Sequence, residues 1–400
     1  MLFRRTALSL KMTVVMLAVT WTTFIVLMHG WMNLKWFDKR AEATPAANGA
    51  APIKKFKIGF IPVTCHLTCP VTNFINTEMG GDGLFEPTRF NGFPEVKEAF
   101  ISGHIDATFI LAPLAMKLRE DGVGLKIVYL GHRDGTALMV HKDSDIQSIK
   151  DLRGKTVAVP SRYANQRLLI FKALRDVGMT IEDIKLIEMP PPDMPVALAT
   201  RSVDAITSGE PFMAQTELDG YGRVLYLTKD IWPNFISCVL AVKDESIKND
   251  RATVQALVDG IAKSGKWLEQ STDLDGNGLR DNREAAAQFV AKFYYNQDPR
   301  MLAFALSKPP DRVRYTNLNI QRPNFEEIQQ LAVMSGVMKG TVSFEDYCDP
   351  SFVTDDTRIQ PWSYAMPKDR MQKTKDGKVL EPEEKSDQAE GNNAETHEGH

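Results

Sequence analysis

The sequence has no excess of charge of either sign and no basic stripe. Its 400 residues include 48 Lys and Arg against 51 Asp and Glu, which gives a formal net charge of −3. A nucleic-acid-binding protein usually carries clustered basic residues, and this sequence has no such electrostatic footprint. We therefore predict no nucleic-acid partner. A net charge this close to zero excludes no class of small ligand. The apolar content of 43% is enough for a large core, and the length suggests two or three domains.

Cysteine is scarce, with four residues in the whole sequence. Cys65 and Cys69 flank His66, but this spacing fits no standard zinc module and no fourth ligand lies nearby. Three interpretations of the cluster stay open. Its side chains bind a soft metal such as Zn or Cu(I), or Cys65 and Cys69 form a disulfide in an oxidising compartment, or all three line a ligand pocket. Cys238 and Cys348 either form a second bridge or stay buried.

Only one long hydrophobic run is present, at residues 12–34, and Arg4, Arg5 and Lys11 precede it. The run is long enough to cross a bilayer. No small-residue cleavage site follows it directly, as a secretory signal peptide would require. For residues 1–55 we expect a signal peptide or, preferentially, a membrane anchor, followed by a spacer. The rest of the chain is then exported to the periplasmic or another extracytoplasmic face and tethered to the inner membrane.

The carboxyl-terminal residues form a segment of different composition. Residues 367–400 contain no aromatic side chain and many Lys, Glu, Asp, Gln and Asn. Such a composition cannot bury enough apolar surface to offset the entropy of ordering, so we predict a disordered tail.

An internal repeat at an offset of 98 residues organises the rest of the chain. KIGFIPV at 57–63 corresponds to KTVAVPS at 155–161, and the segment that ends at Pro113 corresponds to the one that ends at Pro211. Similarity at a fixed offset usually means that one supersecondary unit is used more than once. Each copy has the strand and helix pattern of an α/β lobe. Two such lobes create a crevice where the carboxyl ends of their strands meet, and the function is expected there.

Polar side chains and helix starts follow the strand ends of both copies. Thr68 suits the start of a helix in the first copy, and Ser161 suits the same place in the second. Two helix N-termini that face each other favour an uncharged or anionic solute over a cation. His66 is expected to face the crevice, and Glu210 is expected to accept hydrogen bonds from the ligand or to orient Arg162. The predicted ligand-binding residues are Thr64, Cys65, His66, Cys69, Ala112, Ser161, Arg162, Tyr163, Ser208 and Glu210.

The segment TDLDGNGLRDNREAAAQF at 272–289 matches the calcium loop of an EF-hand, D-x-D/N-x-D/N-G-x5-E. Helical sequence precedes and follows it, as the motif requires. The sequence has no second such loop, so we predict a lone structural Ca²⁺ site and not a paired sensor. The alternative is an acidic turn between two helices. The predicted ligands are Asp273, Asp275, Asn277, Leu279 through its carbonyl, Asp281 and Glu284.

Several segments in a fixed order resemble the substrate-binding proteins of nitrate, bicarbonate, taurine and sulfonate ABC importers. They are GFIPVT, SGHIDATFILAP, DLRGKTVAVP and SGEPF, and the resemblance covers residues 56–300. It implies the type II periplasmic binding protein fold, in which two α/β lobes are joined by crossing strands. Members bind a small solute between the lobes and close by a hinge motion. Residues 64–69 differ from those of nitrate-type chains, so the identity of the solute does not carry over.

The resemblance also implies a domain organisation and a function. Lobe one is expected at 56–135 and 244–366, with the calcium loop at 273–284, and lobe two at 136–243, with crossing strands at 135–141 and 236–243. The implied function is not enzymatic: the exported protein captures a small anionic or sulfonate-like solute and delivers it to the permease of an ABC importer. The alternatives are an enzyme similar to the pyrimidine synthases of thiamine formation, which share this fold, and a membrane-tethered ligand sensor. Those enzymes are cytoplasmic, and the export segment counts against them.

Overall fold

The computed structural model describes residues 56–81, 83, 85–270, 281–352 and 358–367, together with some residues between 12 and 28. The described residues between 12 and 28 are helical. Within the described part of the chain, no helix combines the length and the apolar character needed to span a membrane. Most of the predicted anchor at 12–34, the spacer that follows it and the predicted tail beyond residue 367 lie outside the described residues.

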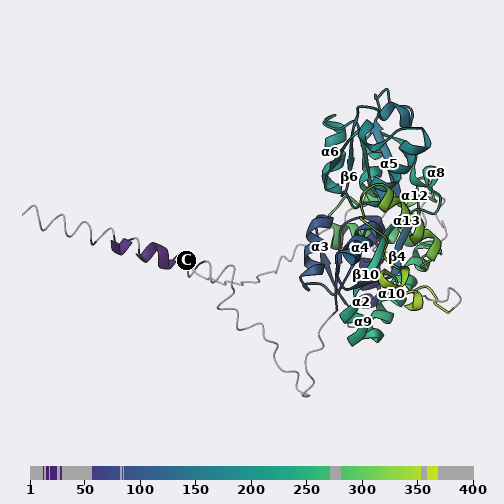
Figure 1. The fold of residues 1–400 in the computed structure, drawn as a ribbon. Helices are drawn as coiled ribbons and strands as arrows, with labels where there is room; N and C mark the ends of the chain where they lie inside the picture. The colour runs from purple at the N-terminus through teal and green to yellow at the C-terminus, as the bar shows by residue number, and fades with distance from the viewer. Residues whose placement is uncertain are drawn as a thin grey trace, which may run out of the picture. The chain divides into compact units, whose positions relative to one another are not determined.

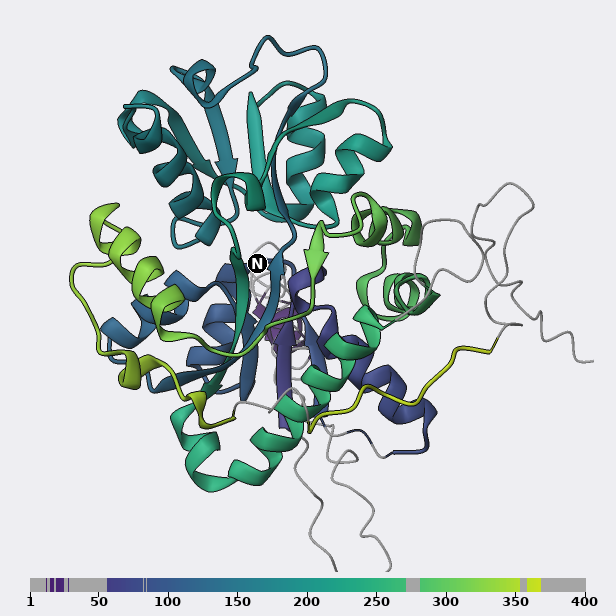
Figure 2. The ribbon, with the colours of Figure 1, turned by 90° about the vertical axis from the view of Figure 1, so that its right-hand side faces the viewer.

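Two α/β lobes make up the body of the protein, each built on its own sheet (Figures 1 and 2). The sheet of lobe one has the strand order β11-β4-β10-β3-β1-β2 and the sheet of lobe two has the order β7-β6-β8-β5-β9. The strands of lobe one are β1 (Phe56–Phe60), β2 (Phe85–Arg89), β3 (Ala107–Ile110), β4 (Leu125–Asp134), β10 (Ile236–Lys243) and β11 (Val313–Arg314). The strands of lobe two are β5 (Thr136–His141), β6 (Thr156–Val159), β7 (Lys185–Glu188), β8 (Ala205–Gly209) and β9 (Gly222–Leu227).

The two lobes repeat one topology, as the sequence offset predicts. In lobe one, β1 pairs in parallel with β2 and β3, and in lobe two, β6 pairs in parallel with β7 and β8. An antiparallel strand follows in each sheet, and it comes from outside the repeated unit: β10 lies between β3 and β4, whereas β5 lies between β8 and β9. The chain therefore crosses between the lobes twice, from β4 to β5 and from β9 to β10. This arrangement confirms the predicted two-lobed α/β fold with crossing strands.

Helices pack on both sheets. Those of lobe one are α2 (Thr68–Glu78), α3 (Phe93–Ile101), α4 (Ala112–Glu120), α9 (Asp244–Asn249), α10 (Arg251–Glu269), α11 (Asp281–Val290), α12 (Pro299–Ser307), α13 (Arg322–Met334) and α14 (Phe344–Tyr347). Those of lobe two are α5 (Asn165–Asp176), α6 (Met194–Ala199), α7 (Phe212–Leu218) and α8 (Thr228–Ile231). Short helical turns lie at η1 (Thr64–His66), η2 (Ile149–Leu152), η3 (Ile181–Asp183), η4 (Pro191–Asp193), η5 (Ala291–Tyr295) and η6 (Pro350–Phe352).

The sequence explains why these elements form. The longest helix, α10, begins after Asp250, whose side chain accepts a hydrogen bond from the Thr253 amide. Val254, Leu257 and Ile261 follow at helical spacing and are buried against the core. By contrast, every residue of β3 is buried, as expected for a strand covered on both faces. The carboxyl ends of β1, β3, β6 and β8 lie next to the boundary between the lobes.

Candidate functional site

A small pocket lies between the lobes, at the carboxyl ends of their parallel strands. Lobe one contributes Val63, Cys65, Phe93, Leu111, Ser237 and Cys238, and lobe two contributes Pro160, Gln166, Pro191, Ser208 and Gly209. These residues form the interlobe pocket. The cavity between them is about 10 Å³, which is the space of roughly one water molecule. A larger solute therefore requires the lobes to move apart from this arrangement.

Direct contacts hold the lobes together around the pocket. The Thr64 amide of lobe one donates to the Glu210 carbonyl of lobe two over 2.7 Å. The Asn165 side chain, at the start of α5, donates to the Ile236 carbonyl on the crossing strand β10. The closed arrangement of the pocket thus rests on polar contacts between strand ends and helix starts.

Neutral polar atoms line the pocket. The Oγ atoms of Ser208 and Ser237 and the Oε1 atom of Gln166 are buried without a hydrogen-bond partner. The amide nitrogen of Gln166 donates to Thr136 Oγ1 over 3.3 Å. Among the described residues, no Asp, Glu, Lys or Arg belongs to the lining. Burying a hydroxyl without a hydrogen-bond partner costs free energy, so these atoms are suited to bind a ligand.

The turn η1 forms part of the lobe-one side of the site, and buried tyrosine hydroxyls donate hydrogen bonds to its backbone and to the residue before it. Tyr295 donates to the Val63 carbonyl over 2.8 Å, and Tyr315 donates to the Thr64 carbonyl over 2.9 Å. The Thr64 hydroxyl in turn lies 2.9 Å from Nε2 of His132. Burial lowers the pKa of His132 to about 4. The imidazole is therefore neutral at pH 7 and acts as a structural partner of Thr64.

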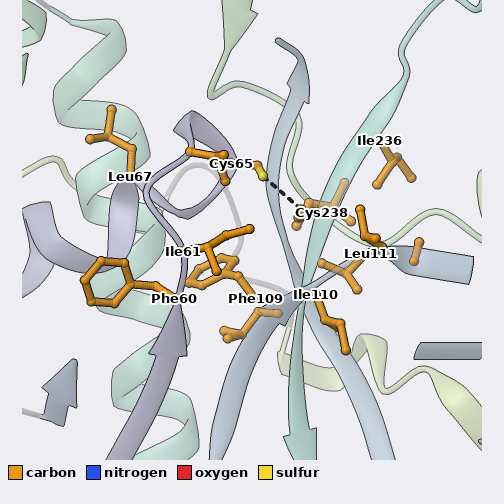
Figure 3. Packing of buried hydrophobic residues seen from close by; sticks show 14 of the residues in the cluster. Phe60, Ile61, Cys65, Leu67, Phe109, Ile110, Leu111, Ile236 and Cys238 are labelled. Carbon is orange, nitrogen blue, oxygen red and sulfur yellow. Dashed lines mark hydrogen bonds between the residues drawn. The ribbon is translucent and has the colours of Figure 1, made fainter. Parts of the chain in front are cut away.

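Cys65 faces Cys238 and not Cys69, so of the three interpretations left open the arrangement does not favour a Cys65–Cys69 bridge. Figure 3 shows the two side chains pointing toward one another, with their Sγ atoms 2.8 Å apart. All four cysteines are free thiols in the structure. Cys69 lies in α2, where burial raises the pKa of its thiol, and it does not line the pocket. The sequence could not reveal this pairing because the two partners are 173 positions apart.

The pKa values of the two paired thiols are shifted in opposite directions. Burial opposes ionisation of Cys65, but the Cys238 thiol and the His66 imidazole together hold the pKa of Cys65 well below its ordinary value. Burial and the neighbouring Cys65 raise the pKa of Cys238. Of the two thiols, Cys65 is therefore the one that ionises more readily.

His66 is placed behind the pocket and not in it. Its side chain is wholly buried, its ring lies 5.4 Å from the ring of Phe109, and its Nδ1 accepts a hydrogen bond from the Ile61 amide over 2.8 Å. This arrangement differs from the prediction that His66 faces the crevice. A ring nitrogen of His66 instead lies within 4.8 Å of the Cys65 and Cys238 sulfurs.

Glu210 also differs from the prediction, because its partner is an arginine from the other lobe. Its carboxylate lies 2.5 Å from Nε of Arg312 and accepts from the Ala214 amide over 2.7 Å. Arg312 pairs with Glu217 as well, over 2.6 Å. Burial raises the pKa of Glu210, and the Arg312 guanidinium partly offsets this. The carboxylate is part of a buried ion pair between the lobes, and each of its oxygens already accepts a hydrogen bond within the protein.

Arg162 points away from the pocket. Its guanidinium is 63% exposed and lies 2.8 Å from the Glu188 carboxylate on lobe two. Tyr163 beside it is half-buried, and Ser161 is buried with its hydroxyl accepting from the Tyr163 amide. Ala112 is buried at the start of α4, next to Leu111, which does line the pocket. Of the ten predicted residues, the structure brings Cys65 and Ser208 into the lining.

The sequence did not reveal most of the lining, because many of these residues are apolar or, like glycine, have no functional group. Val63, Leu111, Pro160 and Gly209 give no chemical signal of their own. The repeat offset was the available signal, since these positions directly adjoin the matched strand ends. Ser237 and Cys238 lie on the crossing strand, and only the sheet order places that strand beneath the pocket.

Most of the predicted calcium loop lies outside the described residues, which resume at Asp281. Asp281 and Glu284 stand in the first turn of α11, and Glu284 is buried. The neighbouring Arg283 is buried too and lies 2.8 Å from Glu269 at the end of α10. The two helices that flank the loop are therefore fixed to each other on lobe one, away from the interlobe pocket.

Comparisons with known proteins agree with this architecture. The sequence profile of the NMT1-like family matches residues 49–291. A relative in Escherichia coli (strain K12), named as an aliphatic sulfonates-binding protein, is 23% identical over 297 residues, which are 73% of this chain and 85% of the relative.

Two solved structures illustrate the range of proteins with this fold. The periplasmic nitrate-binding protein NrtA from Synechocystis PCC 6803 has a TM-score of 0.65 at 14% identity, covering 74% of this chain and 86% of NrtA. The desulfurization enzyme DSZB has a TM-score of 0.53 at 15% identity, covering 74% of this chain and 96% of DSZB. At these identities the likeness concerns the fold alone.

Proposed function

The chain belongs to the NMT1-like family, and from this premise we propose that it captures a small anionic or sulfonate-like solute and delivers it to an ABC importer. The observation that carries the proposal is the pocket between the two lobes, to which both contribute. The E. coli relative named for aliphatic sulfonates supports the same solute class. In this role the lobes open to admit the solute and close around it, and the closed face docks on the permease.

The chemistry of the pocket favours a solute rich in hydrogen-bond acceptors. Ser208 and Ser237 supply neutral hydroxyls, and no acidic side chain of the described residues lines the pocket to repel an anion. The helix α5 begins next to the crevice, where its Gln166 lines the pocket, and it has no side-chain cap at its N-terminus. Helix N-termini carry partial positive charge, which stabilises an anion without a lysine or arginine.

Calorimetry against nitrate, nitrite, bicarbonate, taurine and alkanesulfonates tests the proposal. Ser208→Ala should weaken binding of the accepted solute by about 1 kcal/mol, or roughly fivefold, through loss of one neutral hydrogen bond. Arg162→Ala is the matched control, because its side chain points outward to Glu188. We expect it to bind as the wild type does. Absence of heat with every solute, or a loss in Arg162→Ala larger than in Ser208→Ala, would contradict the proposal.

Catalysis in the same crevice is a second candidate function. The observation in its favour is the Cys65 thiol, which lines the pocket and has a lowered pKa. Mass spectrometry of candidate solutes after incubation with the protein separates the two functions. A binding protein returns every solute unchanged, whereas an enzyme forms a product that disappears in Cys65→Ser.

We also propose that the loop at 273–284 binds a structural Ca²⁺ ion through Asp273, Asp275, Asn277, the Leu279 carbonyl, Asp281 and Glu284. The motif fills every ligand position, and the packed helices α10 and α11 supply the context that such a loop needs. The ion would stabilise lobe one and would not touch the solute.

Export and tethering through the apolar run at 12–34 are part of the proposed function. The run is preceded by basic residues, as expected for a segment whose amino-terminal end stays in the cytoplasm. Alkaline extraction of membranes from the native cells should leave the protein in the pellet. Recovery in the periplasmic extract, with a shortened amino terminus, would indicate a cleaved signal.

A further inference from the structure

Two buried thiols lie next to each other in the lining of the interlobe pocket. Cys65 lies on the turn after β1 and Cys238 on the crossing strand β10, and their sulfurs are 2.8 Å apart (Figure 3). Both residues line the pocket, and they are 2% and 1% exposed. Two cysteines can be bridged only when their side chains already face each other. The fold meets this requirement, because the two sulfurs are already in contact.

The surroundings give the two thiols different roles. Because Nδ1 of His66 accepts the Ile61 amide proton, the proton of the neutral ring resides on Nε2. That Nε2–H is buried without a hydrogen-bond partner, and a nitrogen of this ring lies within 4.8 Å of both sulfurs. It favours negative charge on either sulfur. Because the pKa of Cys65 is lowered and that of Cys238 is raised, we assign attack to Cys65 and resolution to Cys238.

The same hydrogen bond argues against a metal at this cluster. Cys65, His66 and Cys238 have the composition of a soft-metal site. A metal-bound histidine, however, donates its second ring N–H to an acceptor. Here the second nitrogen, Nδ1, accepts from Ile61, so Nε2 carries a proton and has no lone pair for a metal. The cluster therefore favours thiol chemistry over metal binding.

We propose that Cys65 and Cys238 are a redox-active pair that forms a reversible intramolecular disulfide across the floor of the crevice. The oxidant is another disulfide, either of a small molecule or of a thiol oxidoreductase. The Cys65 thiol loses its proton, and the resulting thiolate attacks one sulfur of that disulfide. A mixed disulfide forms, the S–S bond of the oxidant breaks, and the released thiolate takes a proton. Cys238 then loses its proton and attacks the Cys65 sulfur, which forms the Cys65–Cys238 bond, breaks the mixed disulfide and releases a second thiolate that takes a proton. The protein loses two electrons and two protons, and the oxidant gains them.

The bond would tie the pocket turn to the crossing strand. The Cys65 carbonyl already lies so close to Gly131 of β4 that a Cβ there would approach its oxygen to 2.2 Å. A covalent link between η1 and β10 closes a segment of 173 residues, which constrains the unfolded chain strongly. The oxidised protein should therefore melt at a higher temperature than the reduced one.

The test uses the full-length protein, first reduced and then exposed under native conditions to a glutathione buffer of graded oxidised fraction. Free thiols are blocked with an alkylating reagent after unfolding, and the peptides are mapped by mass spectrometry. We expect a single disulfide between the peptides of Cys65 and Cys238, reversed by reducing buffer, with a melting temperature several degrees above that of the reduced protein. This outcome is independent of the solute, so it can succeed or fail separately from the proposed function.

Controls distinguish this pair from nonspecific oxidation. Cys65→Ser and Cys238→Ser should each abolish the bridge, whereas Cys348→Ser, which removes another buried thiol, should retain it. The wild-type map needs no variant, so a folding defect in a variant leaves the test intact. Four free thiols in the native protein, a Cys65–Cys69 bridge, or a stable glutathione adduct on Cys65 would each overturn the proposal. Tight binding of added Zn²⁺ that protects both thiols from oxidation would overturn it as well.

Discussion

The two lobes share the order of five strands, to which lobe one adds β11, but they differ in the turn that follows their first parallel strand. In lobe one this turn is TCHLTC, all of it buried, with a thiol in the pocket and two tyrosine hydroxyls fixing its carbonyls. In lobe two the equivalent turn is SRYANQ, in which Arg162 is exposed and pairs with Glu188. The shared scaffold therefore carries two unlike strand ends, as expected when function resides in loops on a rigid frame.

The difference shows that position in the repeat does not determine the role of a side chain. Cys65 and Arg162 occupy comparable turns, yet one lines the pocket and the other faces solvent. Likewise Glu210, a predicted ligand-binding residue, follows the last strand of its repeat, but its carboxylate forms an ion pair with Arg312 of the other lobe. Tertiary contacts decide these outcomes, within one lobe for Cys65 and Arg162 and between the lobes for Glu210, and mutations at such contacts test the difference.

The largest expected effect is that of Arg312→Met. The change removes the cation that neutralises the wholly buried Glu210 and also pairs with Glu217. Leaving a buried carboxylate without its partner should lower the free energy of unfolding by about 3–5 kcal/mol. Urea unfolding at pH 7 measures it. The matched control is Arg162→Ala, which breaks an exposed ion pair of lobe two and should leave the midpoint unchanged within error. Equal midpoints for the two variants would mean that the interlobe pair does not stabilise the fold.

A pH-dependent effect of similar size is expected at His132, beneath the lobe-one turn. Burial lowers its pKa from 6.5 to about 4. Between these values the unfolded chain binds a proton that the native imidazole does not, so the free energy of unfolding falls as the pH falls. The loss should approach about 3 kcal/mol by pH 4. His132→Gln should flatten the stability profile between pH 4 and about 6.5 relative to wild type and leave it parallel above that range. Parallel profiles throughout would show that His132 titrates normally.

A smaller effect is expected at Gly131, which lets the lobe-one turn approach β4. An added methyl group would lie 2.2 Å from the Cys65 carbonyl oxygen, which belongs to the backbone and cannot rotate away. Gly131→Ala should therefore destabilise the protein by about 1–3 kcal/mol through forced movement of the turn. Gly340→Ala is the control, because a Cβ there meets nothing within 4 Å. Thermal unfolding of the two variants compares them directly, and a neutral Gly131→Ala would indicate a pliable turn.

The smallest expected effect belongs to the calcium loop of lobe one, which has no counterpart in lobe two. At millimolar Ca²⁺ a weak structural site should stabilise the fold by about 1 kcal/mol. Chelation should lower the melting temperature of the wild type, and Glu284→Gln should remove the difference between calcium and chelator. Solute affinity should stay the same in all these samples. If the wild type melts identically with calcium and with chelator, the segment is only an acidic turn.

The sequence was sufficient for the features that depend on local pattern and on repetition. The 98-residue offset predicts two α/β lobes, and the matched words place β1 and β6, and likewise β3 and β8, at equivalent positions. Short apolar strand segments and the turn residues that follow them carry this information, so it can be read without knowing which elements meet. The resemblance to importer binding proteins rests on the same strand ends, and the fold confirms it.

Only the tertiary structure decided which side chains meet at the crevice. The partner of Cys65 is Cys238, and the partner of Glu210 is Arg312, at separations of 173 and 102 residues. Both pairings arise because β10 and the segment leading to β11 return to lobe one after the chain has built lobe two. A local sequence pattern carries no information about such distant contacts. Burial, charge and hydrogen-bond partners at the site therefore follow from the order of strands in the two sheets.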